Sequence, residues 1–151
     1  LVSSVPGKPR FGFEVRLLIE DIEKFLGYHR WTNAVIIGAG GLGRAILKYE
    51  GFENYGINVI AAFDNAPAMI GAAAGKPIYP MERLGDVVRR HQVKVCILTV
   101  PRSAAQEACD RAVGCGIGAI LTFAPVHLTV PEGVTVKYED LAVSLAELCG
   151  A

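Results

Sequence analysis

The sequence predicts an α/β fold in which helices cover both faces of a parallel β-sheet. Short, continuously apolar runs typical of fully buried strands alternate with segments of helical periodicity. A glycine-rich turn joins the first of these runs directly to a helix. The length of 151 residues, with 52% hydrophobic and 20% charged residues, is typical of one globular domain.

The expected elements follow one another in a regular order. Apolar residues at helical spacing from Val15 to Leu26 predict a first helix, which ends at Gly27. Strands are expected at 34–37, 57–63, 93–100, 119–123 and 134–138. Helices are expected at 42–49, 81–91, from Ser103 to near Gly114, and at Leu141, Leu145 and Leu148. The segment 65–77 is interpreted as a loop, and Ser103-Ala-Ala-Gln106 as a capping box.

Charge and composition exclude several classes of protein. Lys and Arg total 15, as do Asp and Glu, so this chain lacks the basic footprint of a nucleic-acid-binding surface. No apolar run approaches the roughly 18 residues of a membrane span, and no signal peptide is visible. The cysteines and histidines lack zinc-site spacing, so we expect no metal and free thiols in a reducing cytoplasm. These residues are Cys96, Cys109, Cys115, Cys149, His29, His91 and His127.

The most informative motif is G-x-G-x-x-G, formed by Gly38, Ala39, Gly40, Gly41, Leu42 and Gly43. It follows an apolar strand and opens a helix, as a Rossmann dinucleotide-binding fingerprint requires. Gly38 permits the tight turn, Gly40 allows a pyrophosphate to approach, and Gly43 allows close packing of helix on sheet. The free N–H groups at the helix N-terminus would bind the phosphates.

An acidic residue completes this fingerprint. Asp64 ends the second strand, 21 residues after Gly43. Its carboxylate would accept hydrogen bonds from the hydroxyls of the adenosine ribose and would repel a 2′-phosphate. Asn65 supplies no compensating positive charge, so the sequence favours NAD(H) over NADP(H).

Catalytic residues are not evident beside this motif. His127 lies between apolar residues and is interpreted as structural, and Glu139-Asp140 as charges at a helix start. Only about 28 residues follow Phe123, too few for a second catalytic domain. We therefore expect a cofactor-binding domain that is not an enzyme. Two alternatives stay open: a fragment of a nicotinamide-dependent oxidoreductase, and a coenzyme A-binding domain of the succinyl-CoA synthetase type.

Several segments resemble the redox-sensing transcriptional repressors of the Rex family. The matching stretches are PGKPRFGFEV (6–15), IIGAGGLGRAILKYEGF (36–52), AAFD (61–64), ILTVP (97–101), AQE (105–107), FAPVHLTVP (123–131) and YEDL (138–141). The stretch FAPVHLTVP is the most specific, because ordinary dehydrogenases lack it. The chain departs from the family at Asn65-Ala66-Pro67, where members often carry a second acid.

The resemblance implies a homodimeric sensor of the NADH/NAD⁺ ratio in the bacterial cytoplasm, which NADH releases from operator DNA. The DNA-reading winged helix would precede Leu1. Residues 1–13 would then be its linker, 14–139 the Rossmann domain, and 140–151 a dimerisation helix exchanged between subunits. The resemblance places the pyrophosphate on 38–43, and the adenosine on Asp64, Thr99, Val100 and Pro101. It places the nicotinamide on Phe123, Ala124, Pro125 and Val126, with Tyr49 and Asp140 as a polar switch.

Overall fold

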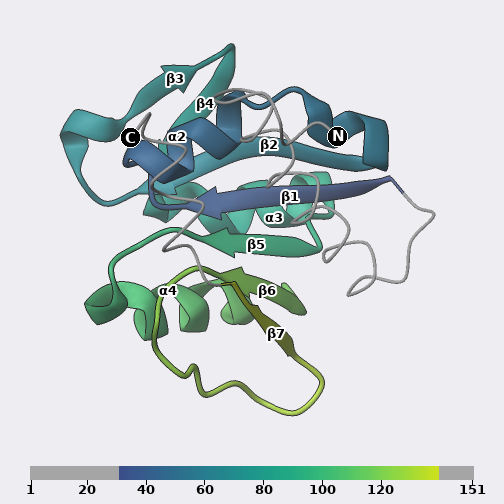
Figure 1. Cartoon of the computed structure of the whole chain (residues 1–151), viewed down its shortest axis with the longest axis vertical. Helices are drawn as coiled ribbons and strands as arrows, with labels where there is room; N and C mark the ends of the chain where they lie inside the picture. The colour runs from purple at the N-terminus through teal and green to yellow at the C-terminus, as the bar shows by residue number, and fades with distance from the viewer. Residues whose placement is uncertain (1–30, 140–151) are drawn as a thin grey trace, which may run out of the picture.

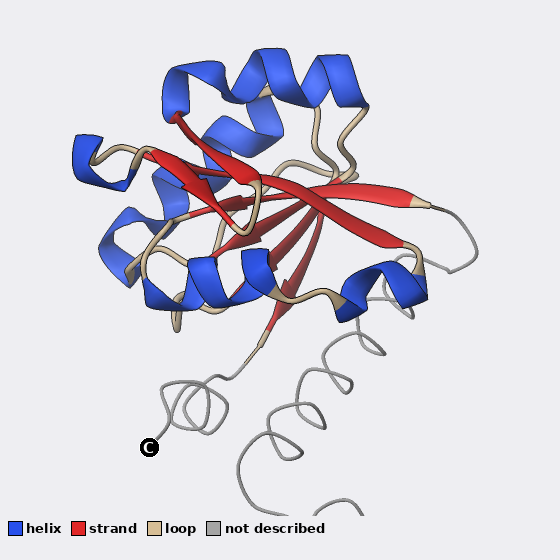
Figure 2. Cartoon of the chain, turned by 90° about the horizontal axis from the view of Figure 1, so that it is seen from above, coloured by secondary structure: helices blue, strands red, loops and turns tan. Residues whose placement is uncertain are grey.

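A computed structural model describes residues 31–139, which form one seven-stranded sheet with helices on both faces (Figures 1 and 2). The strands are β1 (Thr32–Ile37), β2 (Ile57–Asp64), β3 (Gly71–Ala73), β4 (Lys76–Pro80), β5 (Val95–Leu98), β6 (Ala119–Thr122) and β7 (Thr135–Tyr138). The α-helices are α2 (Gly41–Lys48), α3 (Leu84–His91) and α4 (Arg102–Gly114). Short 3₁₀ helices are η2 (Gly51–Tyr55), η3 (Pro67–Met69) and η4 (Met81–Arg83).

The strand order is β3-β4-β2-β1-β5-β6-β7. Every pair is parallel except β3 with β4, so the predicted parallel sheet is confirmed, with one antiparallel edge strand. The six parallel strands have the order of a doubly wound Rossmann sheet, in which the chain reverses direction of travel between β1 and β5. The predicted N-terminal arm, first helix, Asp140 and C-terminal helix lie outside the described residues.

Two apolar cores result from the alternation of side chains along the buried strands. In β1, Ala34 and Ile36 pack with α2 and η2, whereas Val35 and Ile37 pack with α3 and α4. Both sets are almost fully buried, which explains why the strand is apolar throughout rather than at every second residue. β5 and β6 show the same alternation between the two cores, so the centre of the sheet is buried on both faces.

The prediction of a loop over 65–77 is wrong. This segment contains η3 and β3, and β4 begins at Lys76. Small side chains made it look irregular, but β3 becomes a strand by pairing its backbone with β4, and this pairing depends little on side chains. A two-residue turn at Ala74 and Gly75 joins the two strands, with φ angles of 55° and 79°.

The predicted capping box is also wrong. The helix α4 begins at Arg102, and its N-cap is Pro101 in an extended conformation, without a side-chain cap. Ser103 therefore lies inside the first turn. Pro101 supplies the extended geometry that an N-cap needs, so the helix starts earlier than the polar pattern indicated.

Candidate cofactor site

The pocket lies where β1 and β5 end side by side, at the carboxyl edge of the sheet. The position is the one at which open α/β sheets bind ligands. Its volume is about 750 Å³. Eleven of the predicted site residues line it: Gly38, Gly40, Gly41, Leu42, Asp64, Thr99, Val100, Pro101, Phe123, Ala124 and Pro125. Ala39, Gly43 and Val126, also predicted, are not among the lining residues.

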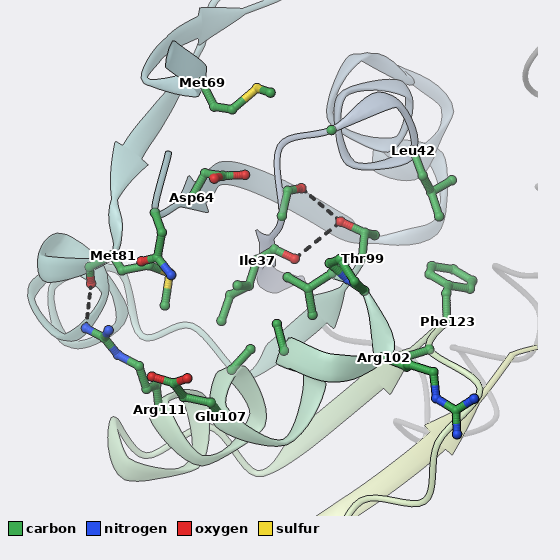
Figure 3. A pocket seen from close by; sticks show the side chains of 18 of the residues that line it. Ile37, Leu42, Asp64, Met69, Met81, Thr99, Arg102, Glu107, Arg111 and Phe123 are labelled. Atoms are coloured by element: carbon green, nitrogen blue, oxygen red, sulfur yellow. Dashed lines mark hydrogen bonds between the residues drawn. The ribbon is translucent and has the colours of Figure 1, made fainter. Parts of the chain in front are cut away.

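The glycine turn is packed tightly against the end of β5. Gly38 has a φ of 112°, a conformation that only glycine adopts readily. The hydroxyl of Thr99 donates to the carbonyl oxygens of Gly38 at 2.8 Å and Ile37 at 3.2 Å (Figure 3). A Cβ at Gly43 would overlap the carbonyl oxygen of Gly38, so α2 can approach the turn only with glycine there.

The N-terminus of α2 is open toward the pocket. Its N-cap, Gly40, has no capping side chain, and a Cβ at Gly40 or Gly41 would meet nothing within 4 Å. The first backbone N–H groups of a helix lack intrahelical partners and carry partial positive charge, which suits a phosphate. The Nε of Arg44 donates to the carbonyl oxygen of Ala39 at 3.0 Å and so orients the peptide that precedes Gly40.

Asp64 lies at the end of β2 beside this turn (Figure 3). Its Oδ2 accepts a hydrogen bond from the N–H of Ala39, and its Oδ1 accepts one from the N–H of Ala66, each at 2.8 Å. The side chain is half-buried and lines the pocket. Because a carboxylate offers about four acceptor positions, Asp64 retains capacity for ribose hydroxyls.

The pocket wall that belongs to α4 was missed by the sequence reasoning. Arg102, Ala104, Glu107, Ala108 and Arg111 line it, and Met69 and Met81 from other elements line the same pocket. An Nη of Arg111 donates to the carbonyl oxygen of Met81 at 3.4 Å (Figure 3). The spacing 104, 107, 108 and 111 marks one helical face, so this signal was present in the sequence. Whether this face points into the pocket depended on how α4 packs on the sheet.

The turn after β6 forms another part of the wall. Phe123 and Ala124 are buried, and the hydroxyl oxygen of Thr122 accepts a hydrogen bond from the N–H of Ala124 at 3.1 Å. Figure 3 shows Phe123 and Leu42 on one side of the pocket, with Asp64 and Met69 on the other. Val126 is half-buried and packs with the core under α3 and α4. The turn therefore offers mostly apolar surface to a ligand.

Tyr49 and His127 lie apart from the lining of this pocket. Tyr49 follows α2, is half-buried, and meets Phe52 edge to face at a ring distance of 5.2 Å. The exposed imidazole of His127 stacks on the ring of Tyr138 at 6.1 Å. This packing agrees with a structural interpretation of His127.

Three of the cysteines are described, and all are free thiols, as predicted. Burial raises the pKa of Cys96, and the nearby Cys109 and Cys115 add to this effect. Burial also raises the pKa of Cys109, followed by the effect of Asp110. Among residues 31–139 no group of three or more His, Cys, Asp or Glu side chains is arranged to hold a metal ion. No helix in the same part of the chain is both long and apolar enough to cross a membrane.

Comparison with known proteins gives two consistent findings. The family described as "CoA binding domain" matches residues 29–126. The Redox-sensing transcriptional repressor Rex of Treponema denticola is 41% identical over 148 residues, which are 97% of this chain and 70% of that protein. The protein of the same name from Roseiflexus sp. is 40% identical over 135 residues, which are 89% of this chain and 61% of the relative.

Solved structures agree. Crystal structures of RSP, a Rex-family repressor, superpose with a TM-score of 0.73 at 35% identity. They cover 89% of this chain and 63–66% of those chains. One holds β-NAD⁺ and operator DNA, and another holds β-NADH. A UDP-D-quinovosamine 4-dehydrogenase from Vibrio fischeri matches at 18% identity and a TM-score of 0.54, which reflects the fold alone.

This chain therefore belongs to the family of redox-sensing transcriptional repressors named Rex, and its central region to the CoA binding domain family.

Proposed function

We propose that this chain is the NAD(H)-sensing domain of a Rex-type repressor. One observation carries the proposal: an uncapped helix N-terminus and the Asp64 carboxylate face the same pocket at the point where the sheet order reverses. The space beside Gly40 and Gly41 is one that a Cβ would fill and that no other part of the described chain occupies. This combination fits a dinucleotide with its pyrophosphate at α2.

Each part of the cofactor has residues of matching chemistry. The loop 38–43 would hold the pyrophosphate, Asp64 the adenosine ribose, and the strand end at Thr99, Val100 and Pro101 the adenosine. The apolar turn from Phe123 to Val126 would face the nicotinamide. The charge of Asp64 opposes a 2′-phosphate, so we expect NAD(H) rather than NADP(H).

The domain would sense the cofactor rather than turn it over. NADH and NAD⁺ differ by a hydride and by one positive charge on the ring. The lining residues of the nicotinamide turn, Phe123, Ala124 and Pro125, carry no acid or base. Tyr49 and Asp140 would couple the ring charge to the C-terminal segment, because only a difference in interaction between the two redox forms can shift an equilibrium.

The assembly proposed here extends beyond the described domain. The chain spans 61–70% of the length of the two relatives given above. We propose a cytoplasmic bacterial homodimer in which residues 140–151 form the dimerisation helix. Operator DNA would be bound through a winged-helix domain in a longer form of the protein, since the charge of this chain is balanced.

The proposal is tested by titrating the purified chain with NADH and following both heat and nicotinamide fluorescence. We expect saturable binding of NADH and no oxidation of it with a panel of hydroxy acids and aldehydes. Sustained consumption of NADH at enzyme-like rates would contradict the proposal. Absence of any binding would contradict it as well.

The name of the matched family makes coenzyme A the second candidate ligand. Its 3′-phosphate and long pantetheine arm have no counterpart in NADH, whereas both ligands carry an adenosine and a pyrophosphate. A competition titration separates them. We expect NADH to displace bound adenine nucleotide at far lower concentration than coenzyme A does, and the reverse order would favour coenzyme A.

A further inference from the structure

The connection from β6 to β7 is unusual because no helix forms in it. Parallel neighbours normally require a crossover of a dozen residues or more, which is usually a helix. Here residues 123–134 make the crossover without one, although its beginning forms the Phe123–Pro125 wall of the pocket. Figure 1 shows this long connection passing beside α4. Side chains from other elements must therefore hold the segment in place.

Gln106 of α4 makes the most specific of these contacts. Its side-chain oxygen accepts a hydrogen bond from the N–H of Thr129, and its Nε2 donates to the carbonyl oxygen of Thr129, both at 2.9 Å. The same Nε2 donates to the carboxylate of Asp110 at 2.8 Å, one helical turn further on. One carboxamide thus pairs both backbone polar groups of a residue 23 positions away, as a neighbouring strand would.

A second side chain holds the adjacent residue from the other direction. The hydroxyl of Tyr138 in β7 accepts from the N–H of Leu128 at 2.8 Å and donates to its carbonyl oxygen at 3.4 Å. Leu128 is 2% exposed, which anchors this point of the crossover in the core beneath α4. Leu128 and Thr129 are consequently held on both sides.

The carboxamide of Gln106 therefore joins two walls of one pocket. Ala104, Glu107 and Ala108 line the pocket from α4, on either side of Gln106 in sequence. Phe123, Ala124 and Pro125 line it from the crossover, four to six residues before Thr129. A change in the distance between α4 and the crossover would move the apolar turn relative to the rest of the cofactor site.

We propose that Gln106 is a positioning residue that sets the nicotinamide end of the pocket by clamping Thr129. The inference rests on the proposed function, since it assumes that the Phe123–Val126 turn faces the nicotinamide. Gln106 would not touch the ligand itself, because it is not among the residues that line the pocket. Its effect on binding is carried by the placement of the turn.

The test compares NADH with ADP-ribose, which lacks only the nicotinamide. In Gln106→Met, which keeps the length of the side chain but not its hydrogen bonds, we expect the Kd for NADH to rise about fivefold. The Kd for ADP-ribose should stay within about twofold of the wild-type value. Gln106→Glu keeps the acceptor for the Thr129 N–H and loses the donor. Its Kd for NADH should therefore lie between those of the wild-type protein and Gln106→Met.

Two matched variants keep the test decisive. Ser103→Ala alters an exposed side chain on α4, one turn before Gln106, and should leave both Kd values unchanged. Tyr138→Phe removes only the hydrogen bonds between the Tyr138 hydroxyl and Leu128. It should weaken the binding of NADH more than that of ADP-ribose, as Gln106→Met does. It also carries the test if Gln106→Met does not fold.

The possible outcomes separate the two proposals. The positioning role is wrong if wild-type protein binds ADP-ribose and NADH, but Gln106→Met and Tyr138→Phe raise the two Kd values equally or not at all. If wild-type protein binds neither ligand, the proposed function itself fails. A blue shift of nicotinamide fluorescence in the wild-type complex that is lost in Gln106→Met supports the positioning role directly.

Discussion

The carboxylate of Asp64 accepts a hydrogen bond of 2.8 Å from the backbone N–H of Ala39, so the end of β2 is tied directly to the glycine turn. The second oxygen accepts from Ala66 at the same distance, which holds the start of the next loop. A residue predicted only to recognise a ribose therefore also shapes the turn that would hold the pyrophosphate. A substitution of Asp64 should therefore affect both the recognition of the ribose and the glycine turn that would hold the pyrophosphate.

Asp64→Ala is expected to weaken NADH binding by about 1.5–3 kcal/mol, or roughly tenfold to 100-fold, because a charged acceptor is lost. Binding of NADPH should suffer less, since the same change removes repulsion of its 2′-phosphate. Calorimetric titration with both cofactors measures the difference. Asp64→Asn is the control, because its amide oxygen can still accept from Ala39. Equal losses for both cofactors would show that Asp64 does not recognise the ribose.

Two glycines of the same motif should respond in opposite ways. At Gly43 a Cβ would overlap the carbonyl of Gly38, so Gly43→Ala should lower the free energy of unfolding by about 1–3 kcal/mol. At Gly40 a Cβ meets no protein atom within 4 Å and φ is −77°, so Gly40→Ala should leave stability nearly unchanged. It should nevertheless weaken NADH binding by filling the space for the pyrophosphate. Denaturant unfolding and calorimetry on both variants test this, and tight NADH binding by Gly40→Ala would contradict the placement.

The hairpin between β3 and β4 contains a correctable strain. Ala74 has a φ of 55°, in the left-handed region that alanine disfavours. Asn-Gly is the preferred pair for a two-residue turn with positive φ at both positions. Ala74→Asn should therefore raise the free energy of unfolding by about 0.5–1 kcal/mol, measured by denaturant titration. Ala72→Asn, at an exposed position of β3 without positive φ, should bring no such gain.

The buried thiol of Cys96 should make stability depend on alkaline pH. Burial raises its pKa in the folded state, so the unfolded chain loses this proton first as pH rises. The protonated thiol contributes fully to the free energy of unfolding below the unfolded pKa of about 8.5. Above that pH the contribution is lost by about 1.4 kcal/mol per pH unit. Unfolding experiments between pH 8 and 10.5 should show this slope, flattened in Cys96→Ala. An identical slope in both proteins would contradict the assignment.

Tyr49 and Asp140 are expected to set the ratio of NADH to NAD⁺ affinity. Tyr49→Phe should retain the edge-to-face contact with Phe52 and so preserve the fold, while removing the hydroxyl. Asp140→Ala removes the charge that would respond to the oxidised ring. Paired calorimetric titrations with NADH and NAD⁺ measure the ratio in each variant. Wild-type ratios in both variants would place the switch elsewhere.

Local signals in the sequence were sufficient for the centre of the fold. The run 34–37, the glycine motif and the following helix form one contiguous strand–turn–helix unit, whose geometry depends on residues close together in the chain. The steric reason for Gly43 is local as well, because a Cβ there would overlap the carbonyl oxygen of Gly38, whereas a Cβ at Gly38 would meet Thr99, which is distant in the chain. The position of Asp64 after the next buried strand followed from the same unit.

Contacts between distant segments decided the rest. The strand β3 exists because its backbone pairs with β4, and its small side chains carry little sign of that. The face of α4 that lines the pocket depends on how the helix lies on the sheet, so Glu107 and Arg111 were not predicted.

Gln106 shows the difference most clearly. Its place in the sequence indicated a local capping box, but its carboxamide pairs with the backbone of Thr129. A side-chain hydrogen bond requires that two groups lie close in space, but they can be far apart along the chain. The sequence by itself thus determined the strand–turn–helix unit and its acidic partner, whereas only the tertiary structure decided which side chains complete the walls of the pocket.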